Sequence, residues 1–220
     1  MKLFPLLTLF LPPSSVKNKI LNMFSHVNIS EDAYIGFSYI DVGKINIEAN
    51  AKIKHLVRMK GLEQVLLKQG SFIGNHNSFY CNSKLGDAGH FTLGLNSELV
   101  RQNALDLTSD VTIGDNVVIG GYGSQFWTHG FDVYRNRIQG EIRIADNVYI
   151  GSSTIFNLGV SICTNVSIGA GSVVSRTIDS SGFYAGAPAV KKNDKYQFTE
   201  TDMIKFVAKK GNSQFFEKEL

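Results

Sequence analysis

The sequence predicts an all-β protein in which short parallel strands wind into a three-sided coil. Large apolar residues recur at every sixth position from Ile144 to Val174, over six consecutive hexads. Four positions after each of them stands a small or β-branched residue, from Val148 to Ile178. A helix would need a period of about 3.6, and an ordinary half-buried strand would alternate along its length. A period of six instead indicates one short strand and one corner per hexad, with three hexads closing each turn of a stacked coil.

Residues 1–25 are predicted to form an apolar, partly helical lead segment. The apolar run from Leu3 to Leu11 is far too short to span a bilayer as a helix. The residues Pro12–Ser15 that follow do not resemble a signal-peptide cleavage site. We therefore expect this segment to pack on the domain or to make peripheral membrane contact. A cytoplasmic protein is expected, with the inner face of the membrane as the alternative location.

Residues 26–190 are predicted to form the coil domain. The six-residue frame continues upstream through Ile113 and Ile119, and more loosely from Ile29 onward. Asn and Gly at the corners suit positions that need positive φ. The formal net charge of +3 is too weak and dispersed for a nucleic-acid partner. Two cysteines are too few for a disulfide framework, which fits a reducing compartment.

The repeat is broken between Ile119 and Ile144, because their separation exceeds four whole hexads by one. The sequence therefore predicts an extruded loop at about 124–140. This loop holds the only tryptophan, Trp127, and also His129. A narrow coil has no interior space for a ligand, and loops on a rigid scaffold commonly carry function. We therefore expect the chemistry to lie at this loop.

Residues 191–220 are predicted to form a C-terminal helical tail. Thr199 and the acidic residues after it resemble a helix N-terminus. Apolar residues from Met203 to Val207 follow with helical spacing, and Gly211 would end the helix. Such a helix would cover an open end of the coil or pack on a neighbouring subunit.

Four motifs occur in an order that resembles the hexapeptide-repeat O-acetyltransferases, which include maltose, galactoside and polysaccharide O-acetyltransferases. They are T-H-G at 128–130, I-R-I-A-D-N-V-Y-I-G-S-S at 142–153, I-G-A-G-S-V-V at 168–174 and Y-A-G-A-P-A-V at 184–190. The resemblance is specific over about 111–192. It implies a left-handed parallel β-helix, a homotrimer and acetyl-CoA bound between neighbouring coils, with no metal.

The resemblance also implies the site residues. His129 matches the catalytic histidine, because imidazole can take a proton from a hydroxyl and deliver it to a leaving thiolate near neutral pH. Ser152 matches the residue whose backbone N–H contacts the thioester carbonyl, and Tyr149 matches an aromatic residue beside the pantetheine arm. Further residues predicted to bind the cofactor are Gly151, Ser153, Gly169, Ala170, Ala185, Gly186 and Pro188, with Arg176, Lys191 and Lys192 for its phosphates.

The predicted acceptor contacts are Trp127, Tyr134 and Arg135 on the loop and Asn103 upstream of it. The group that orients His129 stays open among Asp132, Glu141 and a backbone carbonyl. The family often has a basic residue where this chain has Val190, so the phosphate partner is also open, with Lys191 as the expected one.

The resulting prediction is O-acetyl transfer to a sugar hydroxyl, in surface polysaccharide biosynthesis, with a sugar or polysaccharide precursor as acceptor. N-acetylation of an amino sugar, free or nucleotide-linked, is the alternative, because the same base can serve an amine. A γ-type carbonic anhydrase would need three zinc-binding histidines with a close pair, which the five histidines of this chain lack. An ice-binding coil would show threonine ladders, whereas the threonines here are scattered.

Overall fold

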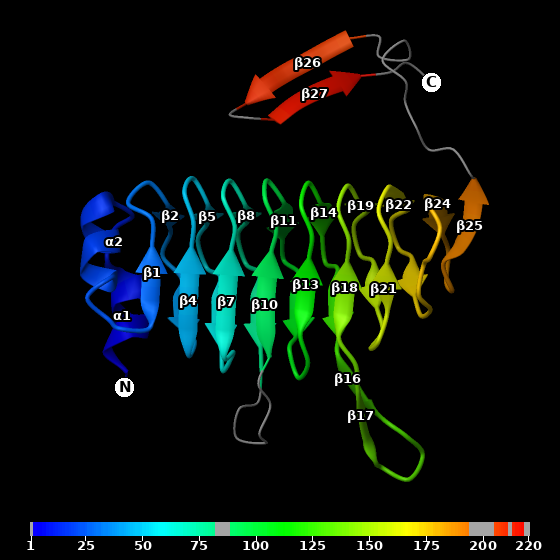
Figure 1. Ribbon diagram of the computed structural model, residues 1–220, viewed down its shortest axis with the longest axis horizontal. Helices are drawn as coiled ribbons and strands as arrows, with labels where there is room; N and C mark the ends of the chain where they lie inside the picture. Colours follow the sequence, from blue (N-terminus) through cyan, green and yellow to red (C-terminus); the bar gives the residue numbers. More distant parts are fainter. Residues whose placement is uncertain (1, 82–88, 194–204, 211–212, 218–220) are drawn as a thin grey trace.

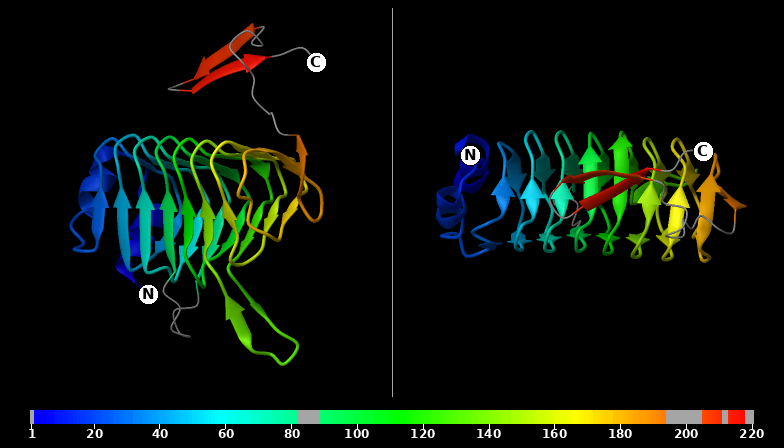
Figure 2. Two further views of the ribbon diagram at one scale, coloured as in Figure 1. Left: turned by 45° about the vertical axis from the view of Figure 1, so that its right-hand side comes forward. Right: turned by 90° about the horizontal axis from the view of Figure 1, so that it is seen from above.

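The three-sided coil predicted from the hexads is the fold of this chain, a left-handed parallel β-helix. The computed structural model describes residues 2–81, 89–193, 205–210 and 213–217. Three parallel sheets, here called A, B and C, form the sides of the coil, and the chain visits them in that order in each turn (Figures 1 and 2). Two helices, α1 (Leu3–Phe10) and α2 (Ser15–Leu21), precede the first strand.

The strands of the three sheets are short. Sheet A contains β1 (Val27–Ile29), β4 (Lys44–Ile47), β7 (Gln64–Leu67), β10 (His90–Leu93), β13 (Val111–Ile113), β18 (Ile142–Ile144) and β21 (Ser161–Ile162). Sheet B contains β2 (Tyr34–Ile35), β5 (Lys52–Ile53), β8 (Phe72–Ile73), β11 (Glu98–Arg101), β14 (Val118–Tyr122), β19 (Tyr149–Ile150), β22 (Val166–Ile168), β24 (Gly182–Ala185) and the antiparallel edge strand β25 (Val190–Asn193). Sheet C contains β3 (Tyr39–Asp41), β6 (Arg58–Lys60), β9 (Ser78–Tyr80), β12 (Ala104–Asp106), β15 (Gln125–Trp127), β20 (Ile155–Phe156) and β23 (Val173–Val174).

The apolar residue of each hexad points into the coil, as predicted. The six that define the frame are at most 2% exposed: Ile144, Ile150, Phe156, Ile162, Ile168 and Val174. They fall in turn on sheets A, B and C, so each hexad supplies one strand. Upstream, the turn that joins Val27 to its sheet A partner Ile45 is three hexads long, whereas the next turn, from Ile45 to Val65, is longer. Unequal turns of this kind explain why the frame is looser there.

The corner between sheets A and B shows why asparagine recurs in the sequence. Asn50, Asn96, Asn116, Asn147 and Asn165 all have φ between 53° and 59°. Asparagine tolerates this left-handed conformation better than most other residues with a side chain. The prediction of positive φ at the corners is therefore confirmed.

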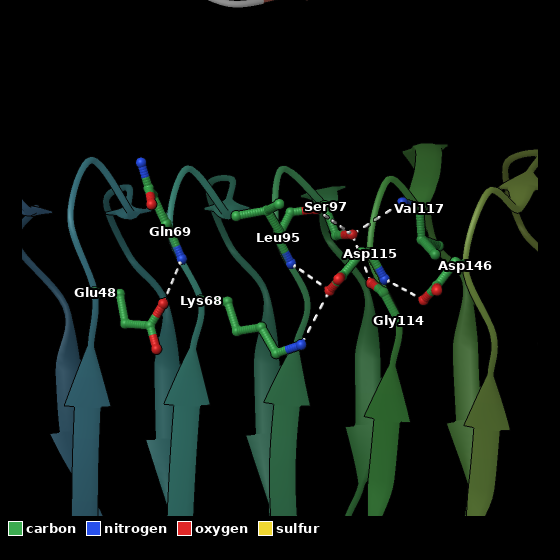
Figure 3. A network of polar contacts seen from close by, with 9 residues as sticks. All are labelled: Glu48, Lys68, Gln69, Leu95, Ser97, Gly114, Asp115, Val117 and Asp146. Atoms are coloured by element: carbon green, nitrogen blue, oxygen red, sulfur yellow. Dashed lines mark hydrogen bonds and ion pairs between the residues drawn. The ribbon is translucent and has the colours of Figure 1, made fainter.

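Carboxylates at the same corner tie neighbouring turns together (Figure 3). Oδ1 of Asp115 accepts hydrogen bonds from the backbone N–H of Leu95 at 2.8 Å and from Nζ of Lys68 at 3.1 Å. Oδ1 of Asp146 accepts from the backbone N–H of Asp115 at 2.7 Å. Hydrogen bonds from the Leu95 backbone and from Lys68 hold the pKa of Asp115 below its usual range, so this carboxylate is charged at neutral pH.

The two N-terminal helices cover the first turn of the coil (Figure 1). Lys17 of α2 is 1% exposed, and its Nζ donates to the carbonyls of Thr8, Leu11, Ile35 and Gly36 at 2.8–3.1 Å. One ammonium thus joins the end of α1 to the first strand of sheet B. Burial lowers the pKa of Lys17 to about 8. No helix in the described part of the chain has the length and apolar character needed to cross a membrane.

The predicted C-terminal helix is wrong where the structure describes this segment. Residues Lys205–Lys210 (β26) and Ser213–Glu217 (β27) form an antiparallel hairpin. Phe206 and Val207 have side chains that favour a strand as readily as an apolar helix face. The expected cap at Thr199 and the apolar positions at Met203 and Ile204 lie outside the described residues.

Candidate active site

The predicted extruded loop at about 124–140 begins later than expected, because Gln125–Trp127 form strand β15 of sheet C. The rest of it is a hairpin that leaves the coil at the corner between sheets C and A (Figure 1). Its strands are β16 (His129–Phe131) and β17 (Arg137–Gln139), paired antiparallel. His129 pairs with Gln139 at the base of the hairpin, next to the coil. The fold therefore places the candidate base against the rigid scaffold and not at the tip.

His129 is oriented by Asp106, the last residue of β12. Its Nδ1 lies 2.9 Å from Oδ1 of Asp106 and 3.1 Å from Oγ1 of Thr108. The carboxylate also accepts from the backbone N–H of Thr108 and from the hydroxyl of Thr128, both at 3.1 Å. An ionised carboxylate only accepts hydrogen bonds, so Nδ1 carries the proton of the neutral imidazole. Nε2 is then the ring nitrogen that can accept a proton.

Neither carboxylate that the sequence offered as the orienting group contacts His129. The carboxylate of Asp132 accepts from the backbone N–H groups of Tyr134 and Asn136 and from Nδ2 of Asn136, each at 2.8 Å, and so builds the hairpin tip. These hydrogen bonds, chiefly from the Asn136 side chain, hold the pKa of Asp132 below its usual range. Glu141 instead pairs with Arg143 at 2.6 Å.

Sequence reasoning missed Asp106 because this residue precedes His129 by more than a full turn of the coil. The signal was available in the register, since Asp106 pairs with Trp127 on the adjacent strand, just before the histidine. Thr108 was missed as well. Its hydroxyl accepts from Nη2 of Arg137 at 3.2 Å, which links β17 to the coil beside His129.

The predicted acceptor contacts fall in three different places. Trp127 is 43% exposed beside the site, with its Nε1 donating to Oε1 of Gln125 at 3.1 Å. Tyr134 and Arg135 lie at the hairpin tip, a full strand of the hairpin away from His129. In the single chain they therefore do not join the site.

Asn103 does not reach the site at all, which corrects its predicted role as an acceptor contact. It is 1% exposed, its Nδ2 donates to Oδ1 of Asn77 at 2.8 Å, and its Oδ1 accepts from the backbone N–H of Ser124 at 2.9 Å. These bonds belong to a polar ladder inside the corner between sheets B and C. A buried corner asparagine and a site asparagine look alike in sequence, and burial distinguishes them.

Most of the predicted cofactor residues lie along the corner between sheets B and C, with Tyr149 exposed on β19. Successive turns pack tightly there, since a Cβ at Gly151 would lie 2.5 Å from the backbone nitrogen of Ala170, and one at Gly169 would lie 3.1 Å from Cβ of Ala185. The result is a strip with few side chains, here called the corner strip, made of Gly151, Ser152, Ser153, Gly169, Ala170, Ala185, Gly186 and Pro188.

The basic residues predicted for the phosphates are separated from one another. Lys191 and Lys192 are exposed on β25, at the edge of sheet B, and Nζ of Lys191 lies 3.4 Å from Oγ of Ser180. Arg176 follows β23, at the corner between sheets C and A. His129 lies at the corner between sheets C and A, where the strands of sheet C end, whereas the corner strip lies where they begin. One chain alone therefore does not bring them together. The described part of the chain holds no group of three side chains that could bind a metal ion.

Comparison with known proteins agrees with this fold. The solved structure of the polysialic acid O-acetyltransferase OatWY matches with a TM-score of 0.61 over 80% of this chain and 91% of that one, at 17% sequence identity, which shows the shared fold. A hexapeptide-repeat acetyltransferase of Vibrio cholerae, solved with acetyl coenzyme A, is 26% identical over 57% of this chain and 72% of that one, with a TM-score of 0.46. No protein-family model matches. The resemblance to the hexapeptide-repeat acetyltransferases, predicted from the motifs, is confirmed.

Two curated proteins are similar to this chain in sequence. The galactoside O-acetyltransferase of Escherichia coli (strain K12) is 38% identical over 99 residues, which is 40% of this chain and 48% of that protein. YvoF of Bacillus subtilis (strain 168), named as an acetyltransferase, is 28% identical over 120 residues, or 53% of this chain and 65% of that protein. The chain thus spans less than two thirds of the length of these curated relatives.

Proposed function

We propose that this protein transfers an acetyl group from acetyl-CoA to a hydroxyl of a sugar, with His129 as the general base. One observation carries the proposal: Nδ1 of His129 is held by Asp106 at the base of the extruded hairpin, which leaves Nε2 to accept a proton. The 38% identity to a galactoside O-acetyltransferase supports the same chemistry.

The reaction follows from this geometry. Nε2 of His129 takes the proton of the acceptor hydroxyl as its oxygen attacks the thioester carbonyl. The negative charge that develops on the carbonyl oxygen needs a donor, and the backbone N–H of Ser152 is the proposed one. When the tetrahedral intermediate collapses, the CoA thiolate leaves and receives the proton from His129. Asp106 stabilises the imidazolium between these two steps.

The site is proposed to form between subunits of a homotrimer. His129 and the corner strip lie at the two opposite corners that bound sheet C, so a single chain cannot form a compact site from both. A cyclic trimer would set the corner strip of one coil beside His129 of the next. The strip has little side-chain bulk, so the pantetheine arm of acetyl-CoA can lie against its backbone. Lys191 and Lys192, exposed on β25 of sheet B, are the proposed partners of the phosphates.

The experiment that tests the function measures thiol release from acetyl-CoA in the presence of a sugar panel. The panel holds galactosides, maltosides, an amino sugar and a nucleotide-linked amino sugar. We expect CoA release that depends on a hydroxyl acceptor, with an ester product that hydroxylamine cleaves. Release only with the amino sugars, giving a stable amide, would instead favour the N-acetyltransferase alternative. Release no faster than in the acceptor-free reaction would contradict both.

Asp106 is a positioning residue in this scheme, and its replacement is a second test. In Asp106→Asn the amide can donate to Nδ1, which would move the ring proton to Nε2 and block it as a base. We expect kcat to fall by about 100-fold or more with little change in KM, and the pH profile to shift. The matched control is Asp132→Asn, because that carboxylate bonds only within the hairpin tip. Equal losses in both variants would remove Asp106 from this role.

A further inference from the structure

The outer face of sheet C carries a row of side chains that starts at the site and runs toward the N-terminal end of the coil. The last residues of neighbouring strands are in register, so their side chains lie one beside the next. In order, the row is Trp127, Asp106, Tyr80, Lys60 and Asp41. Neighbouring members are about 4.8 Å apart, the spacing of strands in a sheet.

Two aromatic side chains flank the carboxylate that orients His129. Trp127 is 43% exposed and Tyr80 is 44% exposed, on opposite sides of Asp106 in the row. Aromatic residues that present both an apolar ring and a polar tip to solvent are typical of binding surfaces. Such rings can stack on the apolar C–H faces of sugar rings. The row therefore offers a platform on each side of the reacting position.

Beyond Tyr80 the surface becomes cationic. Arg58 and Lys60 both project outward from β6, roughly 7 Å apart along the strand, and Lys60 is roughly 10 Å, or two strand spacings, from Asp106. Both are exposed, and neither forms an ion pair with any residue in the described ranges. The next acid of the row, Asp41, is paired with Lys2 at 2.8 Å. Among the described residues, Arg58 and Lys60 are thus two cations without an ion pair, held on the same sheet as Asp106.

We propose that the acceptor is an anionic sugar that lies along this row, with rings over Trp127 and Tyr80 and a carboxylate or phosphate at Arg58 and Lys60. This inference rests on the proposed function and names the substrate class of the same site. The guanidinium of Arg58 can bind two oxygens of one anionic group, while Lys60 adds a point charge. The hydroxyl that reacts is then the one that the bound anion places beside His129.

The test uses a double variant, Arg58→Gln with Lys60→Gln, that removes both of these positive charges. The control, Lys44→Gln with Lys52→Gln, removes two exposed lysines from sheets A and B. Calorimetry at low salt measures binding of three probes: tetragalacturonate with carboxylates, UDP-galactose with phosphates, and neutral maltotetraose. We expect the wild type to bind at least one anionic probe more tightly than maltotetraose. The double variant should lose about tenfold in that affinity and leave maltotetraose binding unchanged, while the control binds as the wild type does.

The aromatic platform has its own variants. Tyr80→Ala should weaken binding of the anionic probe and of maltotetraose alike, whereas Tyr80→Phe should keep most of both affinities, because it keeps the ring. An equal loss in the control double variant, or anionic probes that bind no better than maltotetraose, would overturn the proposal even if acetyl transfer is found. Binding of an anionic probe that depends on Arg58 and Lys60, without any CoA release, would contradict the proposed function but support the proposed binding surface.

Discussion

Replacing His129 with alanine is expected to lower acceptor-dependent CoA release at least about 100-fold. The variant loses the imidazole that would act as the base, and a hydroxyl is a weak nucleophile unless a base takes its proton. The KM for acetyl-CoA should change little, because the proposed role of His129 is to take the proton of the acceptor hydroxyl, whereas the corner strip is the proposed contact of the pantetheine arm. Steady-state kinetics with a thiol reagent measure both quantities. Turnover near that of the wild type would exclude His129 as the base.

A mixed-oligomer experiment shows whether that loss reflects a site shared between subunits. The partner variant is Ala170→Trp, which places a bulky ring on the corner strip. Each variant alone should be nearly inactive. After unfolding and refolding together in equal amounts, about a quarter of wild-type activity should return, because about one interface in four joins an intact His129 to an intact strip. Mixed oligomers that form without regaining activity would contradict a site between subunits.

Replacing Lys17 with methionine is expected to lower the free energy of unfolding by about 3 kcal/mol at neutral pH. Methionine fills a similar volume but donates no hydrogen bond, so the carbonyls of Thr8, Leu11, Ile35 and Gly36 lose their shared donor. Denaturant unfolding monitored by circular dichroism measures the change. The matched control is Lys19→Met on the same helix, whose exposed ion pair with Glu31 spans 3.5 Å and should contribute less than about 1 kcal/mol. Equal midpoints for the two variants would refute this role of Lys17.

The same lysine predicts a pH dependence with a definite sign. Burial lowers the pKa of Lys17 to about 8 in the folded chain, whereas its ordinary value is 10.5. Between these values the unfolded chain holds the proton that the folded chain has released, so the free energy of unfolding rises with pH across this window. The difference between wild type and Lys17→Met should therefore widen from pH 8 to pH 10.5. A constant difference would show that the folded pKa is not lowered.

The hexads predicted the fold well because burial in a narrow coil leaves little choice of side chain at the inward positions. Ile150 and Ile168 could be assigned to the core from spacing alone. The break in that spacing predicted the loop that holds His129, and the resemblance of the T-H-G motif to the acetyltransferases gave this residue its predicted role. Asp106 was not found, because its distance to Trp127 in the sequence depends on how long each turn is, and turn length varies in this chain.

The other differences have equally physical causes. Asn103 looks like a surface residue in sequence, yet it is buried because a neighbouring asparagine and a backbone N–H satisfy its amide. The helix predicted for the C-terminal segment was wrong because residues such as Phe206 and Val207 suit either a helix face or a strand.

The tolerance of the coil for unequal turns has a consequence for how such proteins acquire new specificities. Val111 and Ile142 remain in register although the whole hairpin lies between them in the sequence, just as Val27 and Ile45 do across a plain turn of three hexads. Extra peptide inserted at the corner of sheets C and A therefore leaves the stacked strands undisturbed, and its entropic penalty grows only slowly with length. Laboratory evolution directed at 130–138 could vary what approaches the imidazole while the scaffold beneath it stays the same.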